Sequence, residues 1–381
     1  MNTHQKYVAT CLFGLESLVG EEIDLLGGKR TETIDGRVCF EAPLADLPKY
    51  NINLRYAERV LVETGRAEVL SFEQLFDAVY SMPWEDYIEK NDCFPVKGHS
   101  IKSKLFSLPD CQRIIKKAVA KRLGSKYGLQ TLPEDGAVKQ IEFFIFKDVA
   151  CLMIDTSGDP LHKRGYRKTS TEAPLRETLA AAMVKLSHPR EDVLLWDPMC
   201  GSGTIAIEAA MLMSNTAPGL NRFFAAEDYG WLTEDDWENA RDEAVEKICD
   251  TSFRARATDI DPSAVEIARE NIRKAGMSKY IECYVKDALT IETEGMKGTV
   301  ICNPPYGERL STVKEAERLY SSMGRQFSKL DKWQIYVLTA DDYFEKLYGR
   351  RADKVRKLYN GMIKCGYYQF FKPIDGNKKQ K

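Results

Sequence analysis

The sequence predicts a multidomain protein, in which a small α+β module precedes a larger α/β domain with a seven-stranded, mostly parallel sheet. Three observations support this fold class. At 381 residues the chain is too long for one ordinary hydrophobic core. Up to about residue 158, short strands alternate with amphipathic helices. From about residue 170 the strands become strongly apolar and alternate with helices, which is typical of a parallel sheet covered on both faces.

The first module is expected to begin with a ferredoxin-like α+β unit, because its strands and helices follow each other in that order. The expected strands of this unit are 7–11, 31–34, 37–41 and 59–68, and its helices are 15–25 and 44–51. A second unit follows, with helices at 71–79 and 110–123 and strands at 93–98, 137–146 and 149–156. Ser71 is the expected N-cap of the first of these helices, with Gln74 completing a capping box.

The α/β domain is expected to contain seven strands, and the last of them should be antiparallel. The expected strands are 193–196, 256–259, 281–286, 299–302, 334–339, 354–359 and 363–370, and the helices are 205–213, 262–274 and 314–329. Only Asn360, Gly361 and Met362 separate the last two strands, which predicts a hairpin and therefore an antiparallel final strand.

Composition indicates a soluble, cytoplasmic protein without a metal centre. Hydrophobic residues make up 44% of the chain and charged residues 29%, and no apolar run could span a membrane. The N-terminus lacks the apolar core of a secretory signal. Ten cysteines occur without CxxC pairs, which fits reduced thiols, and the four histidines are too dispersed to suggest a metal cluster.

Basic residues dominate the stretch from Lys97 to Lys126, where Asp110 is the single acid. Lysines at helical spacing usually form a solvated helix face, but such a face normally mixes both signs of charge. A surface that binds a nucleic-acid backbone is therefore favoured. A second basic cluster with an embedded aromatic residue spans 162–168. The candidate RNA-binding residues are Lys102, Lys104, Arg113, Lys116, Lys117, Lys121, Lys163, Arg164 and Arg167.

A glycine-containing turn follows the first strand of the α/β domain. Gly201 and Gly203 would let the backbone approach a ligand and leave the helix N-terminus open. Without a third glycine this is a weak dinucleotide fingerprint, and the alternative is a simple tight turn. Asp197 before the turn suits a cationic amino-acid group better than a pyrophosphate. The candidate ligand-binding residues of this turn are Asp197, Cys200, Gly201, Gly203 and Thr204.

Two further strand ends carry acidic residues. Asp259 is placed to hold the two hydroxyls of a ribose, whereas Asp261 before Pro262 is the expected N-cap of a helix. Asp287 could accept a hydrogen bond from an adenine amine, although a lone aspartate there would more often be a surface turn residue. Ile260 and Ala288, which follow these acids, complete the candidate cofactor-binding residues.

The tetrad Asn303, Pro304, Pro305 and Tyr306 ends the next apolar strand. Its Asn and a backbone carbonyl can accept both N–H bonds of an exocyclic amine, and Tyr306 can stack on the ring that carries it. The prolines restrict the backbone and so fix the direction of Asn303. The alternative is a Pro-Pro exit from a buried strand. We expect these four residues to form the catalytic site.

Three such strand ends followed by the tetrad form one crevice at the carboxyl edge of a sheet. A sulfonium-bearing nucleoside needs this combination of an amino-acid pocket, a ribose clamp, an adenine slot and an acceptor site. The order resembles class I S-adenosylmethionine-dependent amino-methyltransferases. The longer strings 197–208 and 303–310, with 162–167 and 173–180, resemble the bacterial 23S rRNA guanine-N2 methyltransferases that carry a THUMP domain.

This resemblance covers essentially the whole chain and implies a Rossmann-like methyltransferase domain after a THUMP module. The implied domains are a ferredoxin-like unit at 1–58, an RNA-binding THUMP domain at 59–158 and the methyltransferase at 164–381. It implies S-adenosylmethionine as cofactor, S-adenosylhomocysteine as product, and RNA, in particular 23S rRNA or a large-subunit precursor, as partner. In the family the segment that closes over the methionine part of the cofactor corresponds to Glu172, Ala173, Pro174 and Leu175.

Two features depart from the family or from a dinucleotide fold. Some relatives carry a second methyltransferase domain, which this sequence does not contain. Residues 214–253, with Trp231 and Trp237, lengthen the distance from the glycine turn to Asp259 well beyond the ~20 residues of a dinucleotide fold. This length argues against NAD, and the sequence predicts no role for the region.

The implied reaction is direct methylation of the N2 amine of a guanosine in RNA. A DNA adenine methyltransferase could use the same tetrad, and a tRNA guanine methyltransferase would differ only in substrate. A non-catalytic RNA-binding or assembly factor is a third alternative. The RNA-module resemblance disfavours DNA, and the intact Asp197, Gly201, Asp259, Asp287 and Asn303 disfavour a catalytically dead fold.

Overall fold

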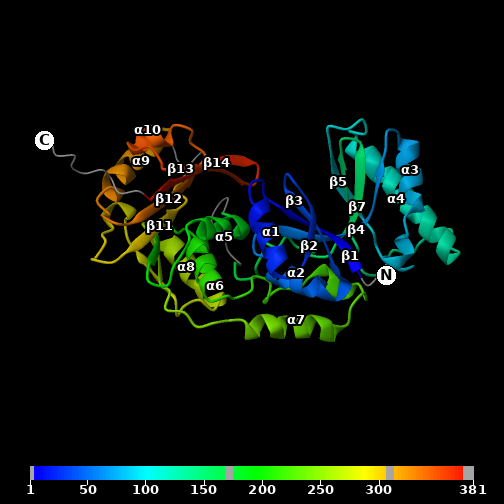
Figure 1. Cartoon of the computed structure of the whole chain (residues 1–381), viewed down its shortest axis with the longest axis horizontal. Helices are drawn as coiled ribbons and strands as arrows, with labels where there is room; N and C mark the ends of the chain where they lie inside the picture. The colour runs from blue at the N-terminus through cyan, green and yellow to red at the C-terminus, as the bar shows by residue number, and fades with distance from the viewer. Residues whose placement is uncertain (1–3, 168–174, 306–312, 372–381) are drawn as a thin grey trace. The chain divides into compact units, whose positions relative to one another are not determined.

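The computed structural model describes residues 4–167, 175–305 and 313–371, and they form two compact units. The N-terminal unit contains the chain up to Cys11, Val19–Leu161 and, returning from later in the sequence, Arg222–Glu243. The methyltransferase unit contains Leu12–Leu18, His162–Asn221 and the chain from Ala244 onward. Figure 1 shows the elements of both units along the chain. Among the described residues, no helix has the length and apolar character needed to cross a membrane.

The N-terminal unit is built on one seven-stranded sheet with the order β2-β3-β1-β4-β7-β6-β5. All its neighbouring strands pair antiparallel except β5 and β6. Its strands are β1 (His4–Cys11), β2 (Lys29–Ile34), β3 (Arg37–Pro43), β4 (Ala57–Glu68), β5 (Val96–Ile101), β6 (Ile141–Phe146) and β7 (Val149–Asp155). Its helices are α1 (Glu16–Leu25, which begins in the other unit), α2 (Leu47–Asn53), α3 (Phe72–Ser81), α4 (Leu108–Tyr127) and most of α7 (Glu234–Glu246).

Strand β4 joins the two α+β modules expected from the sequence. It is 12 residues long, and it pairs with β1 on one side and with β7 on the other. One sheet therefore continues from the ferredoxin-like part into the second part, with a register shift in each of the two ladders. The expected strand at 93–98 begins later, at Val96, and Cys93 makes only an isolated bridge with Val138.

Residues 222–243 complete the N-terminal unit. The Lys139 side chain is 1% exposed, and its ammonium donates to the carbonyls of Tyr87 and Tyr229, at 3.0 Å each, while pairing with Asp92 at 2.7 Å. The Trp231 indole donates to the Tyr87 carbonyl at 3.0 Å. A buried ammonium needs such partners, so this returning segment satisfies a polar group that the first part of the chain leaves in the interior.

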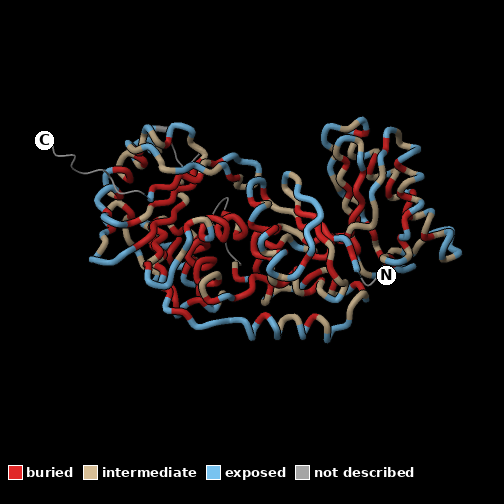
Figure 2. Tube along the Cα trace, viewed as in Figure 1, coloured by how far each residue is buried: buried red, intermediate tan, exposed pale blue. Residues whose placement is uncertain are grey.

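Helix α7 within this segment is mostly solvent-exposed, as Figure 2 shows along its length. Its buried residues are Trp237 and Ala244, and Trp237 stacks on Phe224 with ring centroids 5.5 Å apart. A helix with one narrow apolar stripe and an acidic first turn gives a weak hydrophobic pattern. This explains why the sequence did not predict it.

The methyltransferase unit has a second seven-stranded sheet, with the order β10-β9-β8-β11-β12-β14-β13. Its strands are β8 (Leu194–Asp197), β9 (Ala255–Asp259), β10 (Ile281–Val285), β11 (Gly298–Cys302), β12 (Gln334–Thr339), β13 (Lys354–Asn360) and β14 (Ile363–Phe370). The first five are parallel, and β14 lies antiparallel between β12 and β13. The predicted fold class, including the antiparallel last strand, is confirmed.

The helices of this unit are α5 (Glu177–Leu186), α6 (Thr204–Met213), α8 (Pro262–Lys274), α9 (Val313–Phe327) and α10 (Phe344–Tyr348). The sequence predicted three of them and missed α5 and α10. Helix α5 is almost completely buried, so it lacks the polar face by which an amphipathic helix is recognised. Helix α10 is only five residues long.

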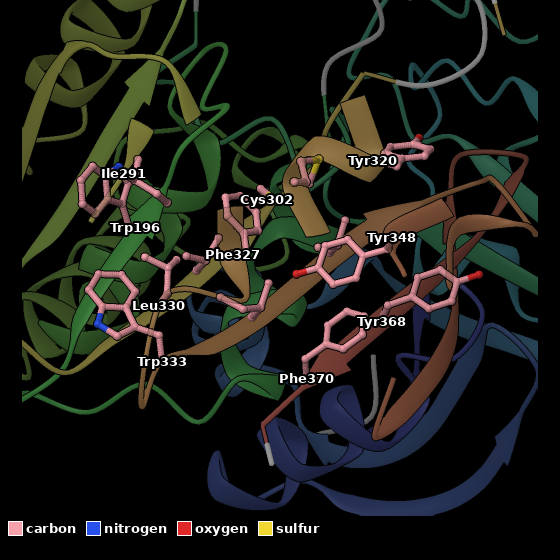
Figure 3. Packing of buried hydrophobic residues seen from close by; sticks show 14 of the residues in the cluster. Trp196, Ile291, Cys302, Tyr320, Phe327, Leu330, Trp333, Tyr348, Tyr368 and Phe370 are labelled. Carbon is pink, nitrogen blue, oxygen red and sulfur yellow. The ribbon is translucent and has the colours of Figure 1, made fainter. Parts of the chain in front are cut away.

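An aromatic-rich core lies under strands β8, β11, β12 and β14 (Figure 3). The Tyr348 and Phe370 rings stack with centroids 4.7 Å apart, and Phe344 lies 4.8 Å from Tyr368. At the start of β11, a Cβ on Gly298 would lie 2.4 Å from the Trp333 indole. Glycine is therefore required there, and the close contact fixes the position of the strand that Asn303 follows.

Removing the cap of α3 should lower the stability of the N-terminal unit. The Gln74 amide donates to Ser71 Oγ at 3.2 Å, and the Gln74 side chain accepts from the Leu70 amide at 2.7 Å. The expected N-cap Ser71 is confirmed. The Gln74 side chain, however, accepts from the amide of Leu70, the residue before the cap, and not from that of Ser71. Ser71→Ala should cost about 1 kcal/mol of unfolding free energy in urea titration. Ser125→Ala, at an exposed helix position, is the control; equal values for both variants would contradict the role of the cap.

Candidate active site

The carboxyl ends of β10, β9, β8 and β11 lie side by side, because these four strands are neighbours and parallel. The structure therefore brings together, at one edge of the sheet, the turn after Asp197, Asp259, the segment ending at Asp287, and Asn303. This is the edge where open α/β sheets bind ligands.

The turn between β8 and α6 has a defined backbone conformation. Gly201 and Gly203 have φ values of 50° and 81°, in the left-handed region that favours glycine. A Cβ on Gly203 would come within 3.2 Å of Ala268 in α8, whereas one on Gly201 would meet nothing within 4 Å. Gly203 is therefore needed for close helix packing, and Gly201 leaves open space above the turn.

Asp197 is a buried carboxylate without a cationic partner among the described residues. Its residue is 1% exposed, and Oδ1 accepts one hydrogen bond, from the Met199 amide at 3.3 Å. Burial, together with the charge of Asp259, raises the pKa of Asp197 well above its ordinary value. A carboxylate in this position favours a positively charged ligand group.

Asp259 connects the strand end to the turn. Its Oδ2 accepts from the Gly201 amide at 2.9 Å, and its Oδ1 accepts from the Asp261 amide at 3.1 Å. A carboxylate offers about four acceptor positions, so two backbone bonds leave capacity for hydroxyl groups. The structure thus gives Asp259 a local structural role that the sequence did not suggest. Asp261 caps α8 by accepting from the Ser263 amide at 2.8 Å, which confirms its predicted role.

Asn271 is a site residue that the sequence analysis missed. It is 2% exposed in α8, and its amide donates to the Ser202 carbonyl at 3.0 Å. The amide of Cys200 bonds to the Thr258 carbonyl at 2.9 Å, so the turn is held from α8 and from β9. The sequence feature that could have indicated its role is a polar Asn on the apolar face of a predicted helix.

Cys200 is a structural thiol in this turn. A hydrogen bond with the Cys283 thiol of β10, together with burial, raises the pKa of Cys200 well above its ordinary value. The thiolate is the nucleophilic form of cysteine, so Cys200 is not arranged for nucleophilic catalysis.

Asp287 and Ala288 lie after β10. Asp287 Oδ1 accepts from the Leu289 amide at 2.8 Å, so this aspartate caps a short 3-10 helix, Ala288–Thr290. The second carboxylate oxygen has no hydrogen bond among the described residues, and Ala288 is buried. Ile260, which follows Asp259, is 68% exposed, an unusual position for a large apolar side chain beside three acidic strand ends.

Asn303 directly follows β11 and carries the clearest chemical signal of the site. Its Oδ1 atom is buried, and among the described residues no donor reaches it. Leaving a buried acceptor unsatisfied costs about 1–3 kcal/mol, so a ligand donor at this oxygen would be stabilising. Pro304 is buried and Pro305 partly buried. Tyr306, like Glu172, Ala173 and Pro174, lies outside the described residues.

The Arg167 guanidinium contacts Leu175 and two helix N-termini. Its Nη2 donates to the Leu175 carbonyl and to Thr204 Oγ1, both at 2.9 Å, and pairs with Glu177 at 3.1 Å. The guanidinium therefore joins α5, Leu175 and the first residue of α6. In the structure Arg167 positions elements around the turn, where the sequence suggested a phosphate contact.

Arg164 is also buried, with a side chain only 2% exposed. Its guanidinium lies 3.5 Å from the Glu208 carboxylate, which also accepts from the Tyr166 hydroxyl at 3.1 Å. These buried groups form an internal network in the methyltransferase unit. The burial leaves Arg164 no route to an RNA phosphate in this structure, whereas Lys163 beside it is exposed.

The basic residues around α4 divide into paired and solvent-facing groups. Arg113 pairs with Asp110 at 2.7 Å, Lys116 with Glu134 at 2.5 Å, and Arg122 with Glu85 at 2.5 Å. Two of these acids come from outside the basic stretch, so the surface is less basic than its sequence. The exposed lysines with no carboxylate partner among the described residues are Lys97, Lys102, Lys104, Lys117, Lys121 and Lys126.

The strand order, the antiparallel β14 and the arrangement of polar groups at one sheet edge define a Rossmann-like methyltransferase. Comparison with protein families also identifies a methyltransferase domain. Residues 164–369 match the family described as the RMKL-like methyltransferase domain, residues 6–61 the RlmL ferredoxin-like domain, and residues 70–155 the THUMP domain.

Individual relatives give the same result. The chain is 41% identical to the putative RNA methyltransferase YpsC of Bacillus subtilis, over 98% of this chain and 97% of that protein. It is 33% identical to the ribosomal RNA large subunit methyltransferase K/L of Psychromonas ingrahamii, covering 92% of this chain but only 48% of that protein. A crystal structure of SMU.472, a putative methyltransferase complexed with SAH, is 41% identical, with a TM-score of 0.90 over 97% of this chain and 99% of its own.

The chain therefore belongs to the RMKL-like methyltransferases, carries a THUMP domain, and is similar over 98% of its length to a putative RNA methyltransferase. This confirms the family resemblance described from the sequence. The chain spans about half the length of the K/L relatives it matches.

Proposed function

We propose that this protein transfers a methyl group from S-adenosylmethionine to the N2 amine of a guanosine in RNA, with 23S rRNA as the substrate. The observation that carries the proposal is the buried Oδ1 of Asn303, which no donor of the described residues reaches, at a sheet edge that presents Asp197 and Asp259. The K/L family supports rRNA as the substrate class.

The residues present fit the cofactor. Asp197 would face its ammonium group, Asp259 would accept from the ribose hydroxyls with its remaining lone pairs, and the second oxygen of Asp287 would accept from the adenine amine. Exposed Ile260 would contact the adenine plane. The open space above Gly201 would admit the amino-acid part. When bound, S-adenosylmethionine supplies an electrophilic methyl group on a sulfonium.

Asn303 would prepare the acceptor. The guanine amine is a poor nucleophile, because its lone pair is delocalised into the ring. Accepting one N–H bond at Asn303 Oδ1 and the other at the Pro304 carbonyl would increase electron density on nitrogen and orient it towards the methyl carbon. The nitrogen–carbon bond forms as the sulfur–carbon bond breaks, and the amine then loses a proton to water. Tyr306 would stack on the base, offsetting the unstacking cost of a few kcal/mol.

Mass spectrometry of digested rRNA and tRNA, from cells with and without the gene, tests this function. Loss of 2-methylguanosine from 23S rRNA in the deleted strain is the expected result. Unchanged rRNA with altered tRNA would refute the substrate part of the proposal. Transfer of labelled methyl to DNA but to no RNA in vitro would refute the RNA assignment, and failure to bind S-adenosylhomocysteine in calorimetry would refute catalysis altogether.

Cofactor binding should release a proton from Asp197. Because the pKa of this buried carboxyl is raised, its contribution to stability is present below the ordinary carboxyl pKa and is lost as pH rises through the folded-state pKa. A ligand ammonium favours the charged carboxylate, so affinity should increase with pH across that range. Calorimetry with S-adenosylhomocysteine, in buffers of different ionisation enthalpy, should detect the proton. Asp197→Asn should bind more weakly and release none; buffer-independent enthalpies for the wild type at every pH would contradict the prediction.

A further inference from the structure

The N-terminal sheet has a pocket on the face opposite α2. Tyr7 and Phe40 point towards α2, where they contact the Tyr50 ring at centroid distances of 6.0 and 4.8 Å. Adjacent residues of a strand point to opposite faces, so Val8 and Cys39 belong to the other face. There they help to line a pocket of about 290 Å³, together with residues from β2, β4, β6 and β7. This volume is at the small end of the range for ligand sites.

Arg37 is a cation on the wall of this pocket without a carboxylate partner among the described residues. Its guanidinium carbon lies 3.7 Å from the centroid of the Phe144 ring, and Nη1 contacts the Met153 sulfur at 3.9 Å. Burial lowers the pKa of Arg37, but an arginine side chain keeps its charge in proteins. The charge of the Glu142 carboxylate acts to raise the pKa of Arg37. Glu142 Oε1 also lies 4.0 Å from Arg59 Nε.

A second arginine in the pocket, Arg66, is neutralised. It contacts Glu63 at 2.9 Å and Glu32 at 2.7 Å, so these three groups together carry one negative charge, which is less than the two positive charges of Arg37 and Lys147. Lys147 adds a positive charge at the turn between β6 and β7. The pocket therefore has an apolar floor and a net positive rim, which is complementary to a ligand with both a flat apolar part and an anionic part.

Aromatic rings provide a surface for the flat part. The rings of Phe144 and Phe146 are nearly parallel, with an interplanar angle of 9° and centroids 5.9 Å apart. Lys147 Nζ lies 5.2 Å from the Phe146 centroid. Successive bases of single-stranded nucleic acid stack on rings arranged in this way beside basic side chains.

The basic loop between β5 and α4 is bonded to the residue that follows Lys147. The Asp148 carboxylate accepts from the Lys104 amide at 2.7 Å, and the Asp148 amide donates to Ser103 Oγ at 3.1 Å. These bonds fix the loop beside the turn that carries Lys147. The loop holds Lys102 and Lys104 in solvent and presents Phe106, which is 80% exposed, as a further ring.

We propose that this pocket, which we define by Arg37, Phe144, Phe146 and Lys147, binds an unpaired nucleotide of the RNA substrate. The base would lie against the aromatic rings and its phosphate against Arg37 and Lys147, and the strand would continue towards Lys102 and Lys104. An unpaired nucleotide is specified because bases inside an A-form duplex cannot present a free face to an aromatic ring. The inference rests on the proposed function, since it takes the methylated RNA as the ligand.

Fluorescence anisotropy with a labelled single-stranded RNA oligonucleotide and the full chain tests the pocket. Phe146→Ala, Lys147→Gln and Arg37→Gln should each raise the Kd, by about tenfold for Phe146→Ala, which removes one base-stacking ring. Arg30→Gln is the matched control, because Arg30 is an exposed β2 residue paired with Asp24 outside the pocket. It should bind like the wild type. Because Arg37 is partly buried, the surface variant Lys147→Gln keeps the test valid if Arg37→Gln fails to fold.

Wild-type affinity in Phe146→Ala and Lys147→Gln would overturn the pocket, and so would an equal loss of affinity for a duplex of the same sequence. A parallel methyl-transfer assay separates this outcome from a failure of the proposed function. If the wild type methylates rRNA while the pocket variants bind and methylate normally, only the pocket assignment fails. If the wild type methylates no RNA, the proposed function fails, whatever the oligonucleotide binding shows.

Discussion

Replacing Asn303 with alanine should lower the rate of methyl transfer about a hundredfold or more, while the affinity for S-adenosylhomocysteine stays close to that of the wild type. The expected size follows from loss of one oriented polar group in a buried site. Among the described residues no donor reaches the buried Asn303 Oδ1, so this oxygen is available to accept from the base. Single-turnover methylation of rRNA transcripts measures the rate, and calorimetry measures the affinity.

The control for this prediction is Asn239→Ala, because Asn239 is an exposed residue of α7. That variant should methylate at the wild-type rate. Normal turnover in Asn303→Ala would remove Asn303 from the catalytic role. A parallel loss of rate and of S-adenosylhomocysteine affinity would instead give Asn303 a role in shaping the cofactor site.

Arg164→Met should lower the unfolding free energy by about 3–5 kcal/mol, because it removes a buried guanidinium that the buried Glu208 carboxylate contacts. Both side chains are at most 2% exposed, so water cannot take the place of the lost partner. Urea unfolding measures the effect. The double variant Arg164→Met with Glu208→Gln should recover part of the loss, because it removes the unpaired charge as well.

The exposed pair Arg269 and Glu266 provides the comparison. Their side chains are 49% and 71% exposed, and Arg269→Met should cost no more than about 1 kcal/mol. If Arg164→Met were as stable as the wild type and bound RNA more weakly, the phosphate contact suggested by the sequence would be restored for Arg164, and its structural role would be refuted.

The strands of the methyltransferase sheet could be predicted to within about one residue, because their apolar runs end abruptly at acidic or glycine residues. Periodicity and caps are local signals, and they also placed α8 and its N-cap Asp261. The grouping of Asp197, Asp259, Asp287 and Asn303 at one edge followed from the parallel strand order. It did not require knowledge of any side-chain contact.

The ion-pair partners of the basic clusters could not be predicted from the sequence. Arg164 is paired with a glutamate 44 positions away, and Lys116 with Glu134 from beyond the end of its helix. Local composition cannot reveal such partners, because only the tertiary fold brings them together. The pocket at Arg37 was missed for the same reason, since it combines residues of six strands, from Val8 to Cys151.

The return of residues 222–243 to the N-terminal unit has a consequence for how such proteins can be recombined. No single crossover point in a gene separates the two units, because the chain enters the first unit a second time after the methyltransferase has begun. A hybrid that joined residues up to 161 to a foreign methyltransferase would lose the Tyr229 carbonyl that Lys139 requires in the interior. The modules are therefore expected to be inherited as a pair, and an exchange that succeeds must carry this second stretch with the first.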